Sequence, residues 1–277
     1  MPPPADFRWN PFWSSSPHGD ALGRLSAELH EMWLAEHSVQ DRERPGIIYH
    51  YTTTRGLIGI IESNEFWATD LNYMSDASEL SYARQLIRSV IEPLRANAGA
   101  PPVRILFERA SRILDPSYRM YYGVCFCEEK DLLSQWRAYG AQGGGFAVGL
   151  KADEIGLSSD VPICLRKVIY DPDRQSRLVE ATLTRTGELL LELAPNEEPA
   201  GAEQVIPIVV HFLEDHLAEF TFTFKNPVFQ EEKEWRVVLP ILPYEVSDAW
   251  RAARFRDSDG LLVPFVPLMV GPRVGPQ

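Results

Sequence analysis

The sequence is poor in cysteine, in long apolar runs and in positive charge. Its three cysteines are too few for a disulfide framework. No apolar run approaches the roughly 20 residues that a membrane-spanning helix needs. The N-terminus carries neither the basic nor the apolar region of a secretory signal. These absences together predict a protein of the reducing cytoplasm with no membrane partner.

The net charge of −12 argues against a general surface for nucleic acid or anionic membranes, and leaves room only for a local basic groove. The chain is rich in apolar and aromatic residues. Hydrophobic residues make up 45% of it, with 7 Trp, 10 Tyr and 13 Phe. That is ample for a large core in one or two domains.

Hydrophobic periodicity predicts a mixture of helices and strands along the chain. Helical spacing is found at about 19–36, 55–64, 77–95, 103–114, 132–140, 173–194 and 203–220. Strand patterns occur at 47–52, 66–69, 121–129, 146–150, 163–170 and 232–239, and a hairpin signal at 257–260. We therefore expect an α+β protein. Its predicted parts are an N-terminal arm and helix at 1–45, a single domain at 46–270 with a helical insertion at about 172–224, and a tail at 271–277.

The stretch KNPVFQEEKEWRVVLPIL contains the most informative predicted strand, residues 232–239. Because side chains alternate across a strand, Glu232, Glu234 and Arg236 would share one face. Like charges stacked on one face repel unless a cation or a substrate lies between them. Two interpretations remain open, namely a solvated face on an edge strand and a catalytic E-x-E pair facing a cleft.

A second informative stretch is IIYHYT, a predicted strand that leads into a helix. The threonines at 52–54 offer a cap for that helix, and His50 precedes them. A histidine and hydroxyl groups beside a helix N-terminus suit a ribose or a phosphate. A single strand histidine is more often a satisfied core residue, so both interpretations stand.

Cys125 and Cys127 share a face of the strand predicted at 121–129. No further cysteine or histidine is spaced to complete a zinc tetrad with them. The prediction is that the protein has no metal site.

Several motifs occur in a recognisable order between about residues 46 and 270: YHYTTTRGLIGIIES, FWATDLNYMSDASEL, CFCEEKDLLSQWRAYG, GGGFAVGL, VIY and FQEEKEWRVV. In this order the chain resembles a widespread bacterial family of unknown function. That family in turn resembles the ADP-ribosyltransferase (ART) superfamily. The resemblance implies split, twisted sheets with flanking and inserted helices, and NAD bound in the cleft between the sheets.

The same resemblance implies roles for individual residues. His50 would hold the adenosine ribose, assisted by the hydroxyl of Thr52. Glu234 would bind the 2′-hydroxyl of the nicotinamide ribose, and Glu232 would orient the acceptor nucleophile.

Further candidates lie on the neighbouring motifs. Trp136 and Tyr139 would stack on nicotinamide, and Tyr51 stands where many transferases have glycine. Cys127 replaces the usual serine after a phenylalanine. Arg236 could keep Glu234 ionised, or it could neutralise Glu232 as a structural ion pair.

The implied function is NAD-dependent ADP-ribosyl transfer to a protein or nucleic-acid acceptor, with NAD as the substrate and no metal. Cleavage of the nicotinamide–ribose bond passes through an oxocarbenium-like centre that a fixed carboxylate stabilises. Hydrolysis of NAD is the same chemistry with water as the acceptor. The contrasting possibility is a non-catalytic module that binds a nucleotide, an antitoxin or another regulatory protein in phage defence or a toxin system.

Overall fold

The structure, a computed structural model, divides the chain into two compact units. The first, helical, comprises Met1–Arg42, Ser78–Tyr118 and Ile169–Asn226, and the second contains the sheet and comprises Glu43–Ala77, Arg119–Val168 and Pro227–Gln277. The structure describes residues 15–35, 45–73, 78–115, 120–140, 144–153, 155, 164–194, 199–241, 253–258 and 260–268. The predicted tail at 271–277 and most of the predicted arm lie outside these ranges. The prediction of one domain over 46–270 stays a prediction.

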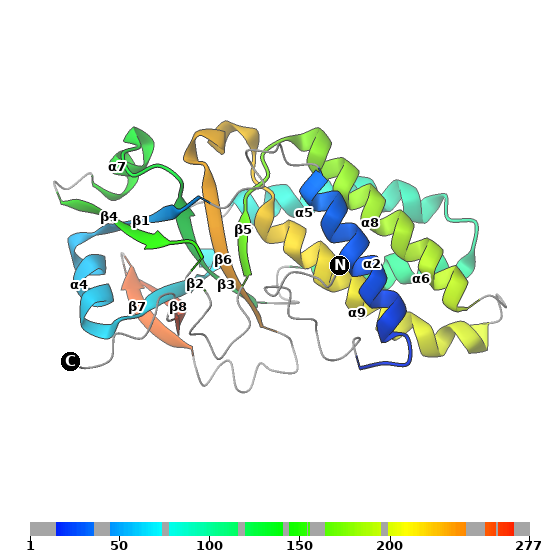
Figure 1. Cartoon of the computed structure of the whole chain (residues 1–277). Coiled ribbons are helices and arrows are strands. Elements are labelled where there is room, and N and C mark those ends of the chain that lie inside the picture. The colour runs from blue at the N-terminus through cyan, green and yellow to red at the C-terminus, as the bar shows by residue number, and fades with distance from the viewer. Residues whose placement is uncertain are drawn as a thin grey trace. The chain divides into compact units, whose positions relative to one another are not determined.

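The helical unit is built from amphipathic helices whose apolar stripes face one another. Helix α8 contacts each of the other long helices, and residues such as Leu22, Ile87, Leu183 and Phe212 are fully buried. None of the described helices is long and apolar enough to cross a membrane. The α-helices, labelled in Figure 1, are α2 (Gly19–Ala35), α5 (Ser78–Ala96), α6 (Pro101–Ala110), α8 (Pro172–Leu193) and α9 (Pro199–Thr223), and the short helix η2 (Ser111–Leu114) follows α6.

A buried polar cluster ties the helical unit together where α8 begins and α9 ends. The Gln175 amide donates to the carbonyls of Ile169 (2.6 Å) and Lys225 (3.1 Å) and accepts from the Tyr82 hydroxyl (2.8 Å). The Lys225 ammonium lies 2.7 Å from a Glu79 carboxylate oxygen. Because buried polar groups cost free energy unless they are paired, these contacts specify how the helix ends meet.

The second unit holds an antiparallel sheet, in which every pairing between named strands is antiparallel. Its helical segments are α4 (Thr54–Ser63), η1 (Leu71–Tyr73), α7 (Leu133–Tyr139) and η3 (Pro227–Glu232). The strands are β1 (Ile47–Thr53), β2 (Phe66–Asp70), β3 (Met120–Cys127), β4 (Gly145–Lys151), β5 (Cys164–Lys167), β6 (Glu234–Ile241), β7 (Arg254–Ser258) and β8 (Leu261–Leu268). The expectation of a mixed α and β protein is confirmed, with a curled antiparallel sheet and several helices.

Strand β3 is the branching point of this sheet. Along one edge it pairs with β6 over its whole length. Along the other edge it pairs with β2 at Tyr122 and Gly123, and with β1 at Cys127. Two branches therefore leave the same edge of β3, one made of β1 and β4 and the other of β2, β8 and β7.

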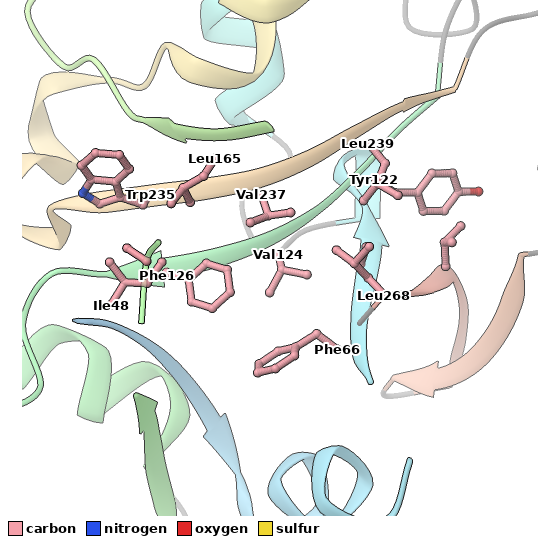
Figure 2. Close-up of a cluster of buried hydrophobic side chains, with 13 residues drawn as sticks. Ile48, Phe66, Tyr122, Val124, Phe126, Leu165, Trp235, Val237, Leu239 and Leu268 are labelled. Carbon is pink, nitrogen blue, oxygen red and sulfur yellow. The ribbon is translucent and has the colours of Figure 1, made fainter. Parts of the chain in front are cut away.

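One face of the sheet carries the hydrophobic core of this unit (Figure 2). The register pairs Phe126 with Trp235 and Val124 with Val237, and directly opposed residues present their side chains on the same face. Phe66 of β2 joins this cluster and lies 6.0 Å from the ring of Phe126. The apolar face of β6 is thus the core face, and its polar residues point to the other side.

The predicted strand at 232–239 is wrong at its start. Glu232 is the last residue of η3, and Lys233 has a φ of 43°, in the left-handed region. The strand begins only at Glu234, which pairs with Cys127. Because the turn at Lys233 interrupts the extended chain, Glu232 does not share a strand face with Glu234.

Candidate functional site

The polar face of the sheet is defined by the register across β1, β3 and β6. Cys127 of β3 lies opposite Tyr49 of β1 on one side and opposite Glu234 of β6 on the other. Opposed residues share a face, and alternation adds Tyr51 and Arg236 to it. We call this the Glu234 face.

Glu234 and Arg236 form a bidentate ion pair on this face. Arg236 Nε donates to Glu234 Oε1 at 2.7 Å, and Nη2 donates to Oε2 at 2.9 Å. The exposed fractions of the two side chains are 6% for Glu234 and 2% for Arg236. Such a bidentate fork is the strongest arrangement available to a guanidinium and a carboxylate. The sequence left open whether Arg236 pairs with Glu232 or with Glu234, and in the structure its guanidinium binds Glu234.

His50 lies on the opposite face of β1. It is flanked by two residues of the Glu234 face, and its ring contacts Phe66 (5.3 Å) and Phe126 (5.8 Å) on the core face. The expectation that His50 and Glu234 line one cleft is therefore wrong, because strand alternation and the register separate them.

The imidazole of His50 has a structural partner. Its Nδ1 lies 2.9 Å from the carbonyl oxygen of Cys125, at the edge where β3 passes from one branch to the other. A carbonyl only accepts, so Nδ1 donates. Burial first, and then the positive charge of Arg256, lower the pKa of His50 despite this hydrogen bond. A neutral histidine that satisfies a strand-edge carbonyl fits the alternative of a satisfied core residue.

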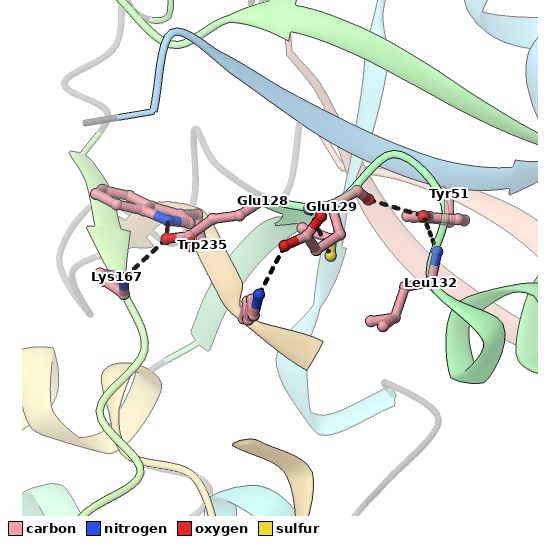
Figure 3. Close-up of polar contacts among 8 residues, drawn as sticks. Tyr51, Glu128, Glu129, Leu132, Lys167 and Trp235 are labelled. Carbon is pink, nitrogen blue, oxygen red and sulfur yellow. Dashed lines mark hydrogen bonds and ion pairs between the residues drawn. The ribbon is translucent and has the colours of Figure 1, made fainter. Parts of the chain in front are cut away.

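Tyr51 connects β1 to the segment that precedes α7. Its hydroxyl donates to the Glu129 carbonyl at 2.7 Å and accepts from the Leu132 N–H at 3.0 Å (Figure 3). Its ring meets the ring of Trp136 edge-on, with centroids 4.8 Å apart. Burial is the main reason why the pKa of Tyr51 is raised. Tyr51 thus positions Trp136, which the resemblance predicted to stack on nicotinamide.

Tyr51→Phe is expected to destabilise the protein by about 1–2 kcal/mol, because it leaves an N–H and a carbonyl without their shared partner. The matched control is Tyr49→Phe. Tyr49 is on the same face of the same strand, half-buried, and its hydroxyl bonds to no described residue, so the cost should stay within about 0.5 kcal/mol. Chemical denaturation of both variants measures the difference. Equal costs would contradict the bridging role of the Tyr51 hydroxyl.

Two carboxylates that the sequence did not single out organise the end of β3 (Figure 3). Glu128 Oε1 accepts from Lys167 Nζ at 2.8 Å and from Trp235 Nε1 at 2.7 Å. Glu129 Oε1 accepts from Lys233 Nζ at 2.6 Å. The sequence signal that could have identified them is an acidic pair directly after a strand. Their partners, however, are remote in the sequence. These contacts hold the start of β6 against the end of β3.

Cys127 is a poor nucleophile. Burial raises the pKa of its thiol to about 11, although the N–H of Glu129 donates to Sγ at 3.2 Å. At pH 8 its reaction with a disulfide reagent should be slower than in the unfolded chain by more than about tenfold, because only the thiolate reacts. Peptide mapping after labelling measures the rate at Cys127. Labelling at equal rates in native and unfolded protein would show that the thiol is exposed.

The remaining candidates are distributed over both faces. Thr52 is buried and lies on the same face of β1 as the histidine, whereas the helix cap is Thr53, whose hydroxyl accepts from the Gly56 N–H at 3.2 Å. Tyr139 is the last residue of α7 and is 38% exposed. The structure therefore brings Glu234 and Arg236 together, seats Tyr51 and Trp136 against one another, and leaves the other candidates elsewhere. Their roles in NAD binding stay predictions.

Metal ligands do not cluster in the part of the chain that the structure describes, since no group of three or more His, Cys, Asp or Glu residues there could hold an ion.

Comparison with known proteins places part of the chain in context. The model of a family described as "Protein of unknown function (DUF2971)" matches residues 135–237. This stretch includes most of α7, the long helices α8 and α9, and the Glu234–Arg236 pair. The expected similarity to a family of unknown function is thus confirmed. No curated protein and no solved structure matches the chain.

Proposed function

We propose that this chain, similar over 135–237 to a family of unknown function, is an ART-like, NAD-cleaving ADP-ribosyltransferase with Glu234 as its catalytic carboxylate. The observation that carries the proposal is the Glu234–Arg236 fork at the start of β6, on the face that also bears Tyr51. The acceptor would be a protein or a nucleic acid.

The sheet supports the ART-like part of this proposal. A split, twisted sheet is what the resemblance implies, and β3 gives off two branches from a single edge. Glu234 lies on β6, next to β3, and Cys127 opposite it marks the place where β1 joins. Glu234 is therefore one strand away from the edge at which the branches diverge, and in this proposal a ligand between the branches reaches its carboxylate.

The chemistry requires a fixed negative charge beside the ribose. As nicotinamide leaves, positive charge develops on the sugar, and a carboxylate that accepts from the 2′-hydroxyl stabilises it. Arg236 donates to both oxygens of Glu234 and so holds the carboxylate in a fixed orientation. Nicotinamide departs as a neutral molecule, so no general acid is needed.

His50 has no catalytic part in this proposal, because it lies on the core face. Trp136, held by Tyr51 and by a 2.7 Å hydrogen bond from its Nε1 to Asp131, is the aromatic group proposed to stack on nicotinamide. Glu232, at the end of η3, stays the proposed group that orients an acceptor.

A specific observation also favours the non-catalytic alternative. Both oxygens of Glu234 are engaged by Arg236, and only 6% of the side chain is exposed. Under that alternative the pair is part of the scaffold, and the module binds a nucleotide or a regulatory protein such as an antitoxin.

Incubation of the purified chain with NAD labelled in the adenylate half separates these functions. Label on a protein or nucleic-acid acceptor indicates transfer, and free labelled ADP-ribose indicates hydrolysis of NAD. A thermal shift with NAD but without turnover supports the binding module and excludes the catalytic proposal. Absence of turnover and of any shift excludes NAD as the ligand.

A further inference from the structure

Two arginines on the same face of β7 have different environments. Arg254 and Arg256 are two positions apart, so their side chains leave the strand on one side. Arg254 is 61% exposed and lies 3.6 Å from a carboxylate oxygen of Glu65. Arg256 is half-buried, and no described carboxylate forms an ion pair with it. The less exposed arginine is thus the one without a counter-ion among the described residues.

The guanidinium of Arg256 makes one hydrogen bond to a described residue. Its Nη2 donates to Thr69 Oγ1 at 3.0 Å. The Thr69 hydroxyl itself donates to the Trp67 carbonyl at 3.3 Å, so its lone pair is turned toward the arginine. Nε is buried and has no acceptor among the residues that the structure describes. A guanidinium has five N–H donors, and most of these therefore have no described protein acceptor.

Electrostatic effects indicate which groups surround Arg256. Burial lowers the pKa of its guanidinium, and Tyr139 lies near enough to raise it. Arg256 in turn lowers the pKa of His50. Besides Thr69 of β2, which it contacts, this charge therefore acts on or is influenced by groups of β1 and α7. A charged group removed from water is costly unless an opposite charge and hydrogen bonds compensate it.

We propose that Arg256 is the anchor of an oxyanion-binding site that takes a phosphate or carboxylate group of a ligand, with Thr69 fixing the guanidinium. The planar fork of an arginine matches the oxygens of either group. A bound oxyanion would supply the negative charge that Arg256 lacks among the described residues. It would also accept hydrogen bonds from the N–H groups of Arg256 that have no described acceptor. In a chain of net charge −12, such a site cannot depend on general attraction of anions and requires this local arrangement.

This site is independent of NAD cleavage, because it needs only the charge and donors of Arg256. The anion site can be absent whether or not the protein cleaves NAD, and NAD cleavage can be absent whether or not the anion binds. The two proposals are therefore tested by different measurements on different variants.

Isothermal titration of the full chain with inorganic phosphate, pyrophosphate and acetate tests the site. We expect at least one of these anions to bind, and Arg256→Gln to weaken that binding by about 10- to 100-fold, as for a lost charge-assisted contact. Arg254→Gln is the matched control, on the same strand and face, and should change the affinity less than about threefold. A preference for pyrophosphate over acetate identifies a phosphate ligand, and the reverse a carboxylate ligand.

Absence of binding by all three anions, or equal weakening by the two glutamine variants, overturns the proposal. If Arg256→Gln does not fold, Arg256→Lys replaces it, since it keeps the charge and loses the fork. A measurement without variants uses phenylglyoxal, which modifies arginine. The anion that binds best should slow modification of Arg256 and leave that of Arg254 unchanged in peptide maps, and unchanged modification of Arg256 overturns the site.

Discussion

Glu234→Gln should lower the free energy of unfolding by about 3–5 kcal/mol, because it removes the carboxylate that forms a bidentate ion pair with a buried guanidinium. Arg236 is 2% exposed, and both of its bonds to Glu234 use carboxylate oxygens. A glutamine offers only one acceptor and turns an NH₂ group toward the guanidinium. A carboxylate in a wet cleft would be lost with little effect on stability, but the 6% exposure of the Glu234 side chain excludes that environment. Denaturant unfolding measures the loss.

Two controls distinguish a lost ion pair from a general effect of neutralising a glutamate. Glu232→Gln removes a half-buried carboxylate from η3 and should cost no more than about 1 kcal/mol. Replacing the whole pair, Glu234→Leu with Arg236→Met, should recover much of the stability, since apolar side chains need no counter-charge. An unchanged stability of Glu234→Gln would show that groups other than Glu234 already compensate the charge of Arg236.

Glu234→Asp should reduce NAD cleavage by about 10²-fold if the proposed function is right. The substitution keeps the negative charge and so retains much of the ion pair, but it withdraws the carboxylate by one methylene. A displacement of that order at the reacting centre is costly, because the stabilising charge must lie where positive charge develops. Release of nicotinamide by the folded variant, normalised to the amount of native protein, measures the effect.

Glu232→Gln is the control for the reaction as well. If Glu232 orients an acceptor, its loss should impair transfer while sparing hydrolysis of NAD by water.

Cleavage by Glu234→Asp at the rate of the unsubstituted chain would show that Glu234 is not a catalytic residue. The pair would then be scaffold, as the non-catalytic alternative has it.

The helices and strands were largely predictable because their signals are local. The periodicity at 173–194 corresponds to α8 (Pro172–Leu193), and the turn sequence DSDG joins β7 to β8, with Ser258 paired to Leu261. Apolar spacing and turn residues act within a few positions of each other, and no distant contact has to be known to interpret them.

The candidate site was less predictable, because it depends on pairing between remote strands. That Glu234 and Arg236 would share a face followed from their spacing alone. That this face also carries Cys127 and Tyr51, and not His50, follows from the register of β1 and β6 on β3. A shift of one residue in such a register would exchange the two faces.

By itself, the sequence determined the class of the fold, the order of its elements and the charged strand that ends in an apolar run. Only the tertiary structure decided that the left-handed turn at Lys233 removes Glu232 from that strand, and that Arg236 closes on Glu234. It also distinguished Arg256 from Arg254. Both side chains leave β7 on the same face, but Arg254 lies near Glu65 and Arg256 binds Thr69. The physical reason is that propensity and periodicity act over a few residues, whereas burial and the partners of a charge are set by chain segments far apart in the sequence.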